Sequence, residues 1–361
     1  MKTAAKRFSR STKTAFITYA MVIAFFVLFT VLNAVGATSS LLRGQLVPIC
    51  AYIVMAISLN LTVGVLGELS LGHAGFMSVG AFTGAIVVAS LRNAIPSGGV
   101  RLLLAIVVAA IFAGIVGVLI GIPVLRLKGD YLAIVTLAFG EIIKGIVNNL
   151  YIGLDEAGLH LALVTDDALS LSPTGKMIID GPMGVSGNEK LSTFTAGIIL
   201  VLVCLVVIYR FIDSRDGRAV LAVRDNYIAA ESVGINVTRY KLLAFTISAM
   251  MAGMAGALFA MNYSTVVATK FDFNTSILVL VFVVLGGLGN IRGSVIAAAL
   301  LTVLPELLRK FSDFRMLIYA IILILSMLIA NSPSISRFLD DNRKKLMKFI
   351  GMKRKGGSVN G

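Results

Sequence analysis

Five ionisable side chains lie inside or beside apolar stretches of this chain: Glu68, His73, Glu141, Lys144 and Glu306. An ionisable group near the middle of a membrane-spanning helix costs about 2.5–3.5 kcal/mol, so such groups are the first candidates for function. Glu68 and His73 belong to the stretch "GELSLGHAGFMSVGAF" (67–82), in which glycines such as Gly72 and Gly75 interrupt the apolar pattern. An active site, a transport pathway and a packing joint between helices are all compatible with this stretch.

Motifs for enzymatic chemistry are missing around these residues. Zinc peptidases place two histidines in H-E-x-x-H, but the second histidine, His160, lies far from His73. A serine hydrolase elbow reads G-x-S-x-G, which "GFMSVGAF" does not supply. The stretch "PTGKM" (173–177) lacks the leading glycine and the Ser or Thr of a phosphate-binding loop. The sequence therefore predicts no catalytic residue, no metal site, no nucleotide site and no bound cofactor on this chain.

The charged groups have structural interpretations beside functional ones. Glu141 and Lys144 are three residues apart, which places them on one face of a helix and favours a structural ion pair. Glu306 lies near a predicted membrane boundary, where it can reach the interface. For Glu68 and His73 two interpretations stay open: a hydrated turn with a packed imidazole, or a gate in a transport pathway.

Composition and the length of the apolar runs indicate a polytopic helical membrane protein. Of 361 residues, 58% are hydrophobic and 14% charged, whereas soluble domains carry about 25% charged residues. Runs of about 20 apolar residues match the ~30 Å hydrocarbon core of a bilayer. Cys50 and Cys204 lie within such runs, so we expect no disulfide framework. We predict ten spans, at 16–35, 45–66, 70–90, 101–122, 131–150, 193–212, 242–262, 275–289, 293–309 and 315–331.

The net charge of +14 is distributed between the apolar runs rather than on one soluble domain. This pattern argues against nucleic-acid binding and for the positive-inside bias of membrane proteins. With the N-terminus in the cytoplasm, 22 of the 32 Lys and Arg residues fall in cytoplasmic segments. We therefore predict that both termini are cytoplasmic, with an N-terminal tail at 1–15 and a basic C-terminal tail at 332–361 around a transmembrane domain at 16–331.

The first apolar run resembles a secretory signal peptide in one respect, because a basic segment precedes it. The run that starts at Phe16 is about 20 residues long, whereas the apolar part of a signal peptide has about 7–15 residues. We therefore predict that this run is an uncleaved first span.

Two long loops separate the predicted spans. The outer loop 151–192 is acidic and contains turn signals such as "DGPMGVSGN", so we expect a solvated connection that could also dock a partner. The cytoplasmic loop 213–241 has apolar residues among its charges, and Gly234 supplies a signal for a helix end. We predict a short amphipathic helix or helix pair there, whose apolar face is buried against a partner or against the bundle.

Small residues and interrupted segments indicate how the helices pack. The stripe "SAMMAGMAGALFAM" (248–261) permits close approach of helix backbones, within the chain or at an interface with another subunit. The segments "VLGELSLGHAG" (65–75) and "VLGGLGNIRG" (284–293) are interrupted by glycines. Broken helices of this kind line cavities in transporters.

Four motifs resemble, in order, those of the LivM-type permeases of branched-chain amino-acid ABC importers. They read "SLNLTVGVLGELSLGHAGFMSVGAF" (58–82), "LRLKGDYLAIVTLAFGEII" (125–143), "GRAVLAVRDNYIAAESVGINV" (217–237) and "LVFVVLGGLGNIRGSVIAAAL" (280–300). The likeness runs over about residues 45–331. It implies an all-α fold of about ten transmembrane helices with broken segments, similar to the cobalamin-importer permease of the type II ABC importers.

The resemblance also implies partners: a second permease subunit in a heterodimer, two cytoplasmic ATPase subunits that bind the ATP, a periplasmic binding protein, and lipid of the bacterial inner membrane. In ABC importers an "EAA…G" loop docks on the ATPase. The loop 213–241 fits that spacing, except that Ile228 stands at the position of the first Glu. The implied coupling residues are Arg224, Ala229, Ala230, Glu231 and Gly234, and the pathway or gate candidates are Glu68, His73, Gly72 and Gly75.

The function that follows is translocation of branched-chain, hydrophobic amino acids delivered by the periplasmic binding protein. A urea or short-amide permease of the same family is the main alternative, because the binding protein largely selects the substrate. The alternative from a different class is an ion-coupled secondary transporter with Glu68, Glu141 or His73 as the coupling group.

Overall fold

The computed structural model describes residues 10–36, 40–127, 129–155, 158–163 and 175–308, with single positions at 317, 320, 321 and 324. The chain divides into two units, Met1–Glu306 and Leu307–Gly361. Every element described below belongs to the first unit, apart from the last residue of the final helix.

Helices lie at nine of the ten predicted spans in the part of the chain that the structure describes. They are α1 (Arg10–Ala34), α2 (Ser40–Asn60) with its π-helical continuation η1 (Leu61–Leu66), α3 (His73–Ser90), α4 (Gly98–Val124), α5 (Asp130–Asn148), α6 (Phe194–Asp213), α9 (Val237–Ala260), α10 (Phe273–Gly286) and α11 (Ile291–Leu307). Because α1 begins at Arg10, part of the predicted tail 1–15 is already helical. The tenth span, 315–331, and the tail 332–361 lie outside the described residues, apart from the single positions in the former.

Seven helical segments of the described chain are long and apolar enough to cross a membrane. They are Ala15–Ala34, Leu42–Leu66, His73–Ser90, Gly98–Val124, Phe194–Asp213, Val237–Ala260 and Ala268–Gly286. α5 and α11 occupy predicted spans but are not among the seven, and the apolar part of α11 is the shorter Ile291–Pro305. The chain is therefore a mostly helical, polytopic membrane protein.

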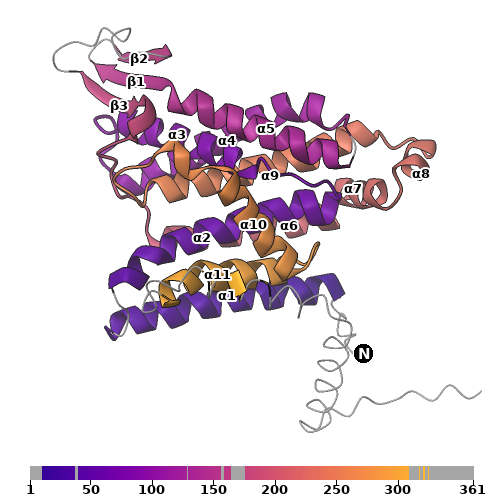
Figure 1. Cartoon of the computed structure of the whole chain (residues 1–361). Coiled ribbons are helices and arrows are strands. Elements are labelled where there is room, and N and C mark those ends of the chain that lie inside the picture. The colour runs from indigo at the N-terminus through magenta and orange to yellow at the C-terminus, as the bar shows by residue number, and fades with distance from the viewer. Residues whose placement is uncertain are drawn as a thin grey trace, which may run out of the picture. The chain divides into compact units, whose positions relative to one another are not determined.

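Helix α9 packs against α2, α3 and α4 and occupies the centre of the bundle (Figure 1). The contact with α3 is so close that a Cβ atom on Gly256 would lie 1.9 Å from the backbone oxygen of Met77. Small residues on α9 therefore let the two backbones touch. The stripe 248–261 packs against other helices of the same chain and is buried there. It is therefore not available as an interface with another subunit, which was the other possibility that the sequence allowed.

A small antiparallel sheet occupies much of the predicted outer loop 151–192 and corrects the all-α prediction. Its strands β1 (Leu150–Asp155), β2 (Gly158–Leu163), β3 (Lys176–Asp180) and β4 (Gly184–Val185) run in the order β2-β1-β3-β4. Ile152, Ile179 and Val185 are buried. Each strand has six residues or fewer, and the glycines, prolines and aspartates between the strands are also the signals of a solvated loop. The residue pattern of this segment therefore does not predict a sheet.

The two glycine-interrupted segments are helix breaks. At the first break, η1 ends at Gly67, whose φ of 82° is a left-handed conformation that favours glycine. The chain then continues without helix until α3 begins at His73. At the second break, residues 287–290 separate α10 from α11. The two breaks lie close together, because a Cβ atom on Gly64 of η1 would lie 2.2 Å from the backbone nitrogen of Gly289.

The predicted cytoplasmic loop 213–241 contains two short helices, α7 (Arg215–Asp225) and α8 (Tyr227–Ser232). The Ser214 hydroxyl accepts a hydrogen bond from the backbone of Gly217 at the start of α7. The Asn226 side chain accepts bonds from the backbones of Ile228 and Ala229 at the start of α8. These N-caps explain why a loop rich in charges forms helices. Gly234 follows α8 with a φ of 85°, the backbone that its predicted role as a helix end requires.

Candidate functional site

The first helix break is the point where the 213–241 loop, the second break and the core of the bundle meet. Its framework is η1, a π-helical turn, and such turns occur frequently at functional sites. Asn60, at the end of α2, is buried and connects two elements: its side-chain nitrogen donates to the Ser294 hydroxyl at 2.7 Å, and its oxygen accepts from the backbone of Gly289 at 2.8 Å. The two breaks are therefore joined by hydrogen bonds.

Arg224, in the last turn of α7, links the loop to the break. Its guanidinium Nη1 donates to the backbone oxygen of Gly64 at 3.2 Å. Its Nε and Nη2 also bind the Asp225 carboxylate, at 3.1 and 2.9 Å. The aliphatic stem lies over Gly67, where a Cβ atom would be 2.7 Å from Arg224 Cγ. Arg224 therefore touches both the π-helical turn and the residue that ends it.

Glu68 is paired with Lys241, a residue of α9 that the sequence did not identify as its partner. The two side chains are only 14% exposed. The carboxylate is thus held against the bundle beside the loop, and the pair is a second link between the break and the start of α9. In the sequence 173 residues separate Lys241 from Glu68, so only folding reveals the contact.

His73 lies in the core between α2 and α3 and is 1% exposed. Its Nε2 is 2.7 Å from the Ser58 hydroxyl oxygen, and that hydroxyl donates to the backbone oxygen of Met55 at 2.8 Å. The Ser58 hydroxyl thus connects the imidazole of His73 to the backbone of α2. The arrangement matches the packed imidazole, one of the two interpretations that the sequence left open.

Gly72 and Gly75, the other gate candidates, contact α5. A Cβ atom on Gly72 would lie 2.0 Å from the backbone oxygen of Thr136, and one on Gly75 would lie 3.0 Å from Cα of Gly140. The Thr136 hydroxyl also accepts a bond from the backbone of Leu71 at 3.0 Å. These glycines bring the start of α3 against the backbone of α5. Thr136 was missed in the sequence, although its position in an apolar helix is a usable signal.

The coupling residues predicted on and just after α8 differ in their burial. Ala230 is buried, whereas Ala229, Glu231 and Gly234 are exposed. Beside them Ile228 and Val233 are 64% and 75% exposed, so α8 presents an apolar surface that no described residue covers. Figure 1 shows α8 projecting from the end of the bundle, with α7 between it and the helices.

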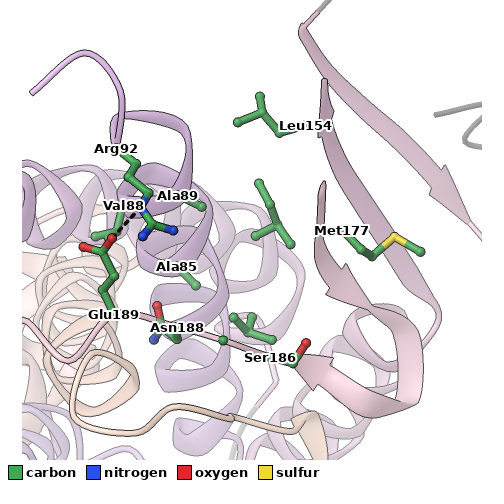
Figure 2. Close-up of a pocket in the computed structure, with 12 residues that line it drawn as sticks. Ala85, Val88, Ala89, Arg92, Leu154, Met177, Ser186, Asn188 and Glu189 are labelled. Atoms are coloured by element: carbon green, nitrogen blue, oxygen red, sulfur yellow. Dashed lines mark ion pairs between the residues drawn. The ribbon is translucent and has the colours of Figure 1, made fainter. Parts of the chain in front are cut away.

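A cavity of about 60 Å³ lies at the other end of α3, between that helix and the sheet. Figure 2 shows Arg92 reaching Glu189 on one side, with Leu154 and Met177 of the strands on the other. Glu189 pairs with Arg92 at 2.8 Å and with Arg101 of α4 at 2.9 Å. Ligand sites are typically about 300–1,000 Å³, so this cavity is too small for a ligand. The two ion pairs of Glu189 hold the segment after β4 against the turn that follows α3 and against α4.

The remaining predicted groups are an ion pair, two thiols and one acid. Lys144 forms an ion pair with Glu141 on α5. Cys50 and Cys204 are both buried and free. Among the described residues, no group of three or more His, Cys, Asp and Glu side chains could hold a metal ion. Glu306 belongs to α11, and its side chain lies outside the described part of the chain.

Breaking the pair between Glu68 and Lys241 should destabilise the fold measurably. We expect Glu68→Gln to lower the melting temperature of the purified protein by about 3–6 °C, because Lys241 then stays charged without its partner in a largely buried position. The double variant Glu68→Gln with Lys241→Gln removes both charges and should recover most of the loss. Equal melting temperatures for the single variant and the unmodified protein would show that the pair contributes nothing.

Comparison with known proteins gives consistent matches. The family model described as "Branched-chain amino acid transport system / permease component" matches residues 41–330. The high-affinity branched-chain amino acid transport system permease proteins LivM of Salmonella typhimurium and Escherichia coli are each 37% identical, over 286 and 289 residues. Each match covers 77% of this chain and 66% of the relative, so the chain spans slightly less than two thirds of these relatives.

A permease with a different name, LivH, is also similar to this chain. The permease protein LivH of the Escherichia coli high-affinity branched-chain amino acid transport system is 25% identical over 297 residues, which is 79% of this chain and 91% of that protein. No solved structure matches the chain at a significant level.

Proposed function

The chain belongs to the family of branched-chain amino acid transport system permeases, and we propose that it is the membrane-spanning permease subunit of an ATP-driven ABC importer. Its cargo is a branched-chain, hydrophobic amino acid delivered by a periplasmic binding protein. The names of the LivM and LivH relatives support this cargo. A urea or short-amide cargo is the alternative within the same family.

The observation that carries the proposal is the link between the 213–241 loop and the first helix break. A permease without a nucleotide site must be driven by a conformational change in another chain, and that chain must bind an exposed surface of the permease. The apolar surface of α8 at Ile228 and Val233 is such a surface. From there α7 leads to Arg224, which contacts the backbone of Gly64 in η1. A displacement of α8 by an ATPase subunit would thus reach the broken helix through a short chain of contacts.

The assembly that we propose has four further components and a fixed orientation. LivM and LivH relatives of one transport system support a second, related permease as partner. Two ATPase subunits, which bind the ATP, contact the chain at α7 and α8. The binding protein docks at the opposite end of the helix bundle, where the sheet lies. We propose, from the distribution of Lys and Arg, that both termini are cytoplasmic and that the chain lies in the bacterial inner membrane. Ten spans in a cobalamin-importer-like fold complete the proposal, the tenth being 315–331.

Uptake measurements on the assembled transporter test this function. We expect vesicles that hold this chain with its partner permease, the two ATPase subunits and the binding protein to accumulate labelled leucine when ATP is present. A protonophore should leave the accumulation unchanged, because no ion gradient drives it. Omitting the ATPase subunits should abolish it.

The same vesicles distinguish the alternatives. Accumulation of leucine by this chain alone, driven by a proton gradient, would identify a secondary transporter. Uptake of labelled urea in place of leucine by the complete assembly would assign the alternative cargo.

A further inference from the structure

The second helix break is a tight turn between two helices whose backbones touch. Residues 287–290 separate α10 from α11. Next to this turn, a Cβ atom on Gly293 would overlap the backbone oxygen of Gly286, so the start of α11 lies directly against the end of α10. Leu288, within the turn, is 58% exposed. The second break is therefore a closely packed unit whose turn reaches the surface of the chain.

One buried side chain, that of Asn60 at the end of α2, connects this unit to the first break. Its amide oxygen accepts a hydrogen bond from the backbone nitrogen of Gly289 in the turn, at 2.8 Å. Its amide nitrogen donates to the hydroxyl of Ser294 in the first turn of α11, at 2.7 Å. Asn60 and Ser294 are both fully buried. A single amide therefore holds both the turn and the helix that follows it.

Gly64 of η1 is the point where this connection meets the contact from α7. A Cβ atom on Gly64 would overlap the side-chain oxygen of Asn60 and the backbone nitrogen of Gly289, so only glycine leaves room for the bond between them. The carbonyl oxygen of the same residue accepts the hydrogen bond from Arg224 at 3.2 Å. The contact from α7 and the contact with the second break therefore converge on one residue.

Pairing of a stray backbone group accounts for only part of this arrangement. A break in a membrane helix leaves backbone groups that need hydrogen-bond partners, and Asn60 supplies one for the backbone nitrogen of Gly289. The second bond of Asn60, to the Ser294 hydroxyl, pairs no backbone group. It adds a second point of attachment, on α11 itself. Both bonds are buried, where the low dielectric strengthens them.

Building on the proposed function, we propose that Asn60 is a positioning residue that makes the second helix break move together with the first. When α7 displaces η1 through Arg224, the Asn60 amide carries residues 287–290 and the start of α11 along with η1. Broken helices border the path of the cargo in transporters. One displacement at α7 therefore rearranges both breaks at once, although α7 contacts only the first of them through Arg224.

The test follows each break separately, by thiol labelling of the complete transporter in vesicles. Leu69 in the first break and Leu288 in the second are 37% and 58% exposed, so Leu69→Cys and Leu288→Cys place one reporter on each break. The native thiols of Cys50 and Cys204 are buried and should not react. We expect the labelling rate at each reporter to differ between the nucleotide-free transporter and the transporter trapped with ATP. The rate is measured on the peptide that carries the reporter.

Asn60→Ala should abolish the nucleotide-dependent difference at position 288 and preserve the difference at position 69, because only the connection between the breaks is removed. The number of leucine molecules imported per ATP hydrolysed should fall roughly fivefold. Arg224→Ala acts before the first break and should abolish the difference at both positions.

Two milder variants keep the test decisive if Asn60→Ala does not assemble. Ser294→Ala removes the bond to the amide nitrogen and leaves the bond to Gly289 in place, so it should reduce the difference at position 288 without abolishing it. Thr302→Ala is the matched control, because the Thr302 hydroxyl bonds only to the backbone oxygen of Ala298 within α11. It should leave the labelling at both reporters unchanged.

Three results would overturn the inference and leave the importer function intact. The first is an unchanged difference at position 288 in Asn60→Ala or, where that variant does not assemble, in Ser294→Ala. The second is loss of the difference at both positions in Asn60→Ala, because Asn60 would then hold the first break itself. The third is an unmodified transporter that imports leucine without any difference at position 288. Failure of the unmodified transporter to import leucine would instead overturn the proposed function, and the two reporters would still show whether the breaks move together.

Discussion

Replacing Arg224 with alanine is expected to lower ATP-driven leucine uptake by roughly tenfold while ATP hydrolysis by the assembled transporter continues. Arg224 supplies the hydrogen bond to the Gly64 oxygen and lies over Gly67. Alanine removes both contacts, so α7 moves without displacing the π-helical turn. The measurement is the number of leucine molecules imported per ATP hydrolysed.

Two further variants define what Arg224 does. Arg224→Lys keeps the charge but not the planar fork that binds Gly64 and Asp225 together, so it should recover only part of the uptake. Arg218 is on the same helix and donates to the backbone oxygen of Asp213, which makes Arg218→Ala the matched control with near-normal uptake. Loss of the ATPase subunits from the purified Arg224→Ala complex would contradict the role in coupling and assign Arg224 to docking.

Substituting alanine for Gly256 is expected to destabilise the transmembrane bundle strongly, although it adds only one methyl group. The new Cβ atom would lie 1.9 Å from the backbone oxygen of Met77 and 2.9 Å from the backbone nitrogen of Ala81. Neither contact can be relieved by turning a side chain, so α3 and α9 must separate. Overpacking of this kind costs about 1–3 kcal/mol or more, and the melting temperature should fall by at least about 5 °C.

Gly44 provides the matched control for this substitution. It lies in α2, and a Cβ atom there would have no heavy atom within 4 Å. Gly44→Ala should therefore leave the melting temperature unchanged or raise it slightly, because alanine restricts the unfolded chain. A Gly256→Ala protein as stable as the Gly44→Ala protein would show that α3 and α9 are not held in close backbone contact.

The link through Arg224 and the packing at Gly256 serve different purposes in the proposed transporter. The α3–α9 contact is rigid, because backbone meets backbone without side chains between them. The first helix break combines close backbone packing at Gly64 and Gly72 with the polar contacts of Arg224, Asn60 and Lys241. It is therefore the polar contacts, and not the packing, that connect the break to α7 and to the start of α9.

Much of the fold could be predicted because its determinants are local. An apolar run of about 20 residues forms a helix in a bilayer whatever its neighbours, since its backbone groups must bond within the segment. The helix positions, the break at Gly67 and the helical character of the 213–241 loop follow from such runs, glycines and caps. The small sheet escaped prediction because strands of six residues or fewer carry little periodic signal, and their pairing joins residues such as Tyr151 and Asp180.

The sequence by itself determined which residues of the site are unusual. Glu68, His73 and the glycines stand out because polar groups and helix breakers are costly in apolar segments. The tertiary structure alone decided what each of them contacts: Glu68 meets Lys241, His73 is buried against Ser58, and Gly72 packs on Thr136. Gly64 lies 160 residues from Arg224 in the chain, and Lys241 lies 173 residues from Glu68. A contact across such a separation depends on how helices pack, and packing is a property of all the surfaces together rather than of any local pattern.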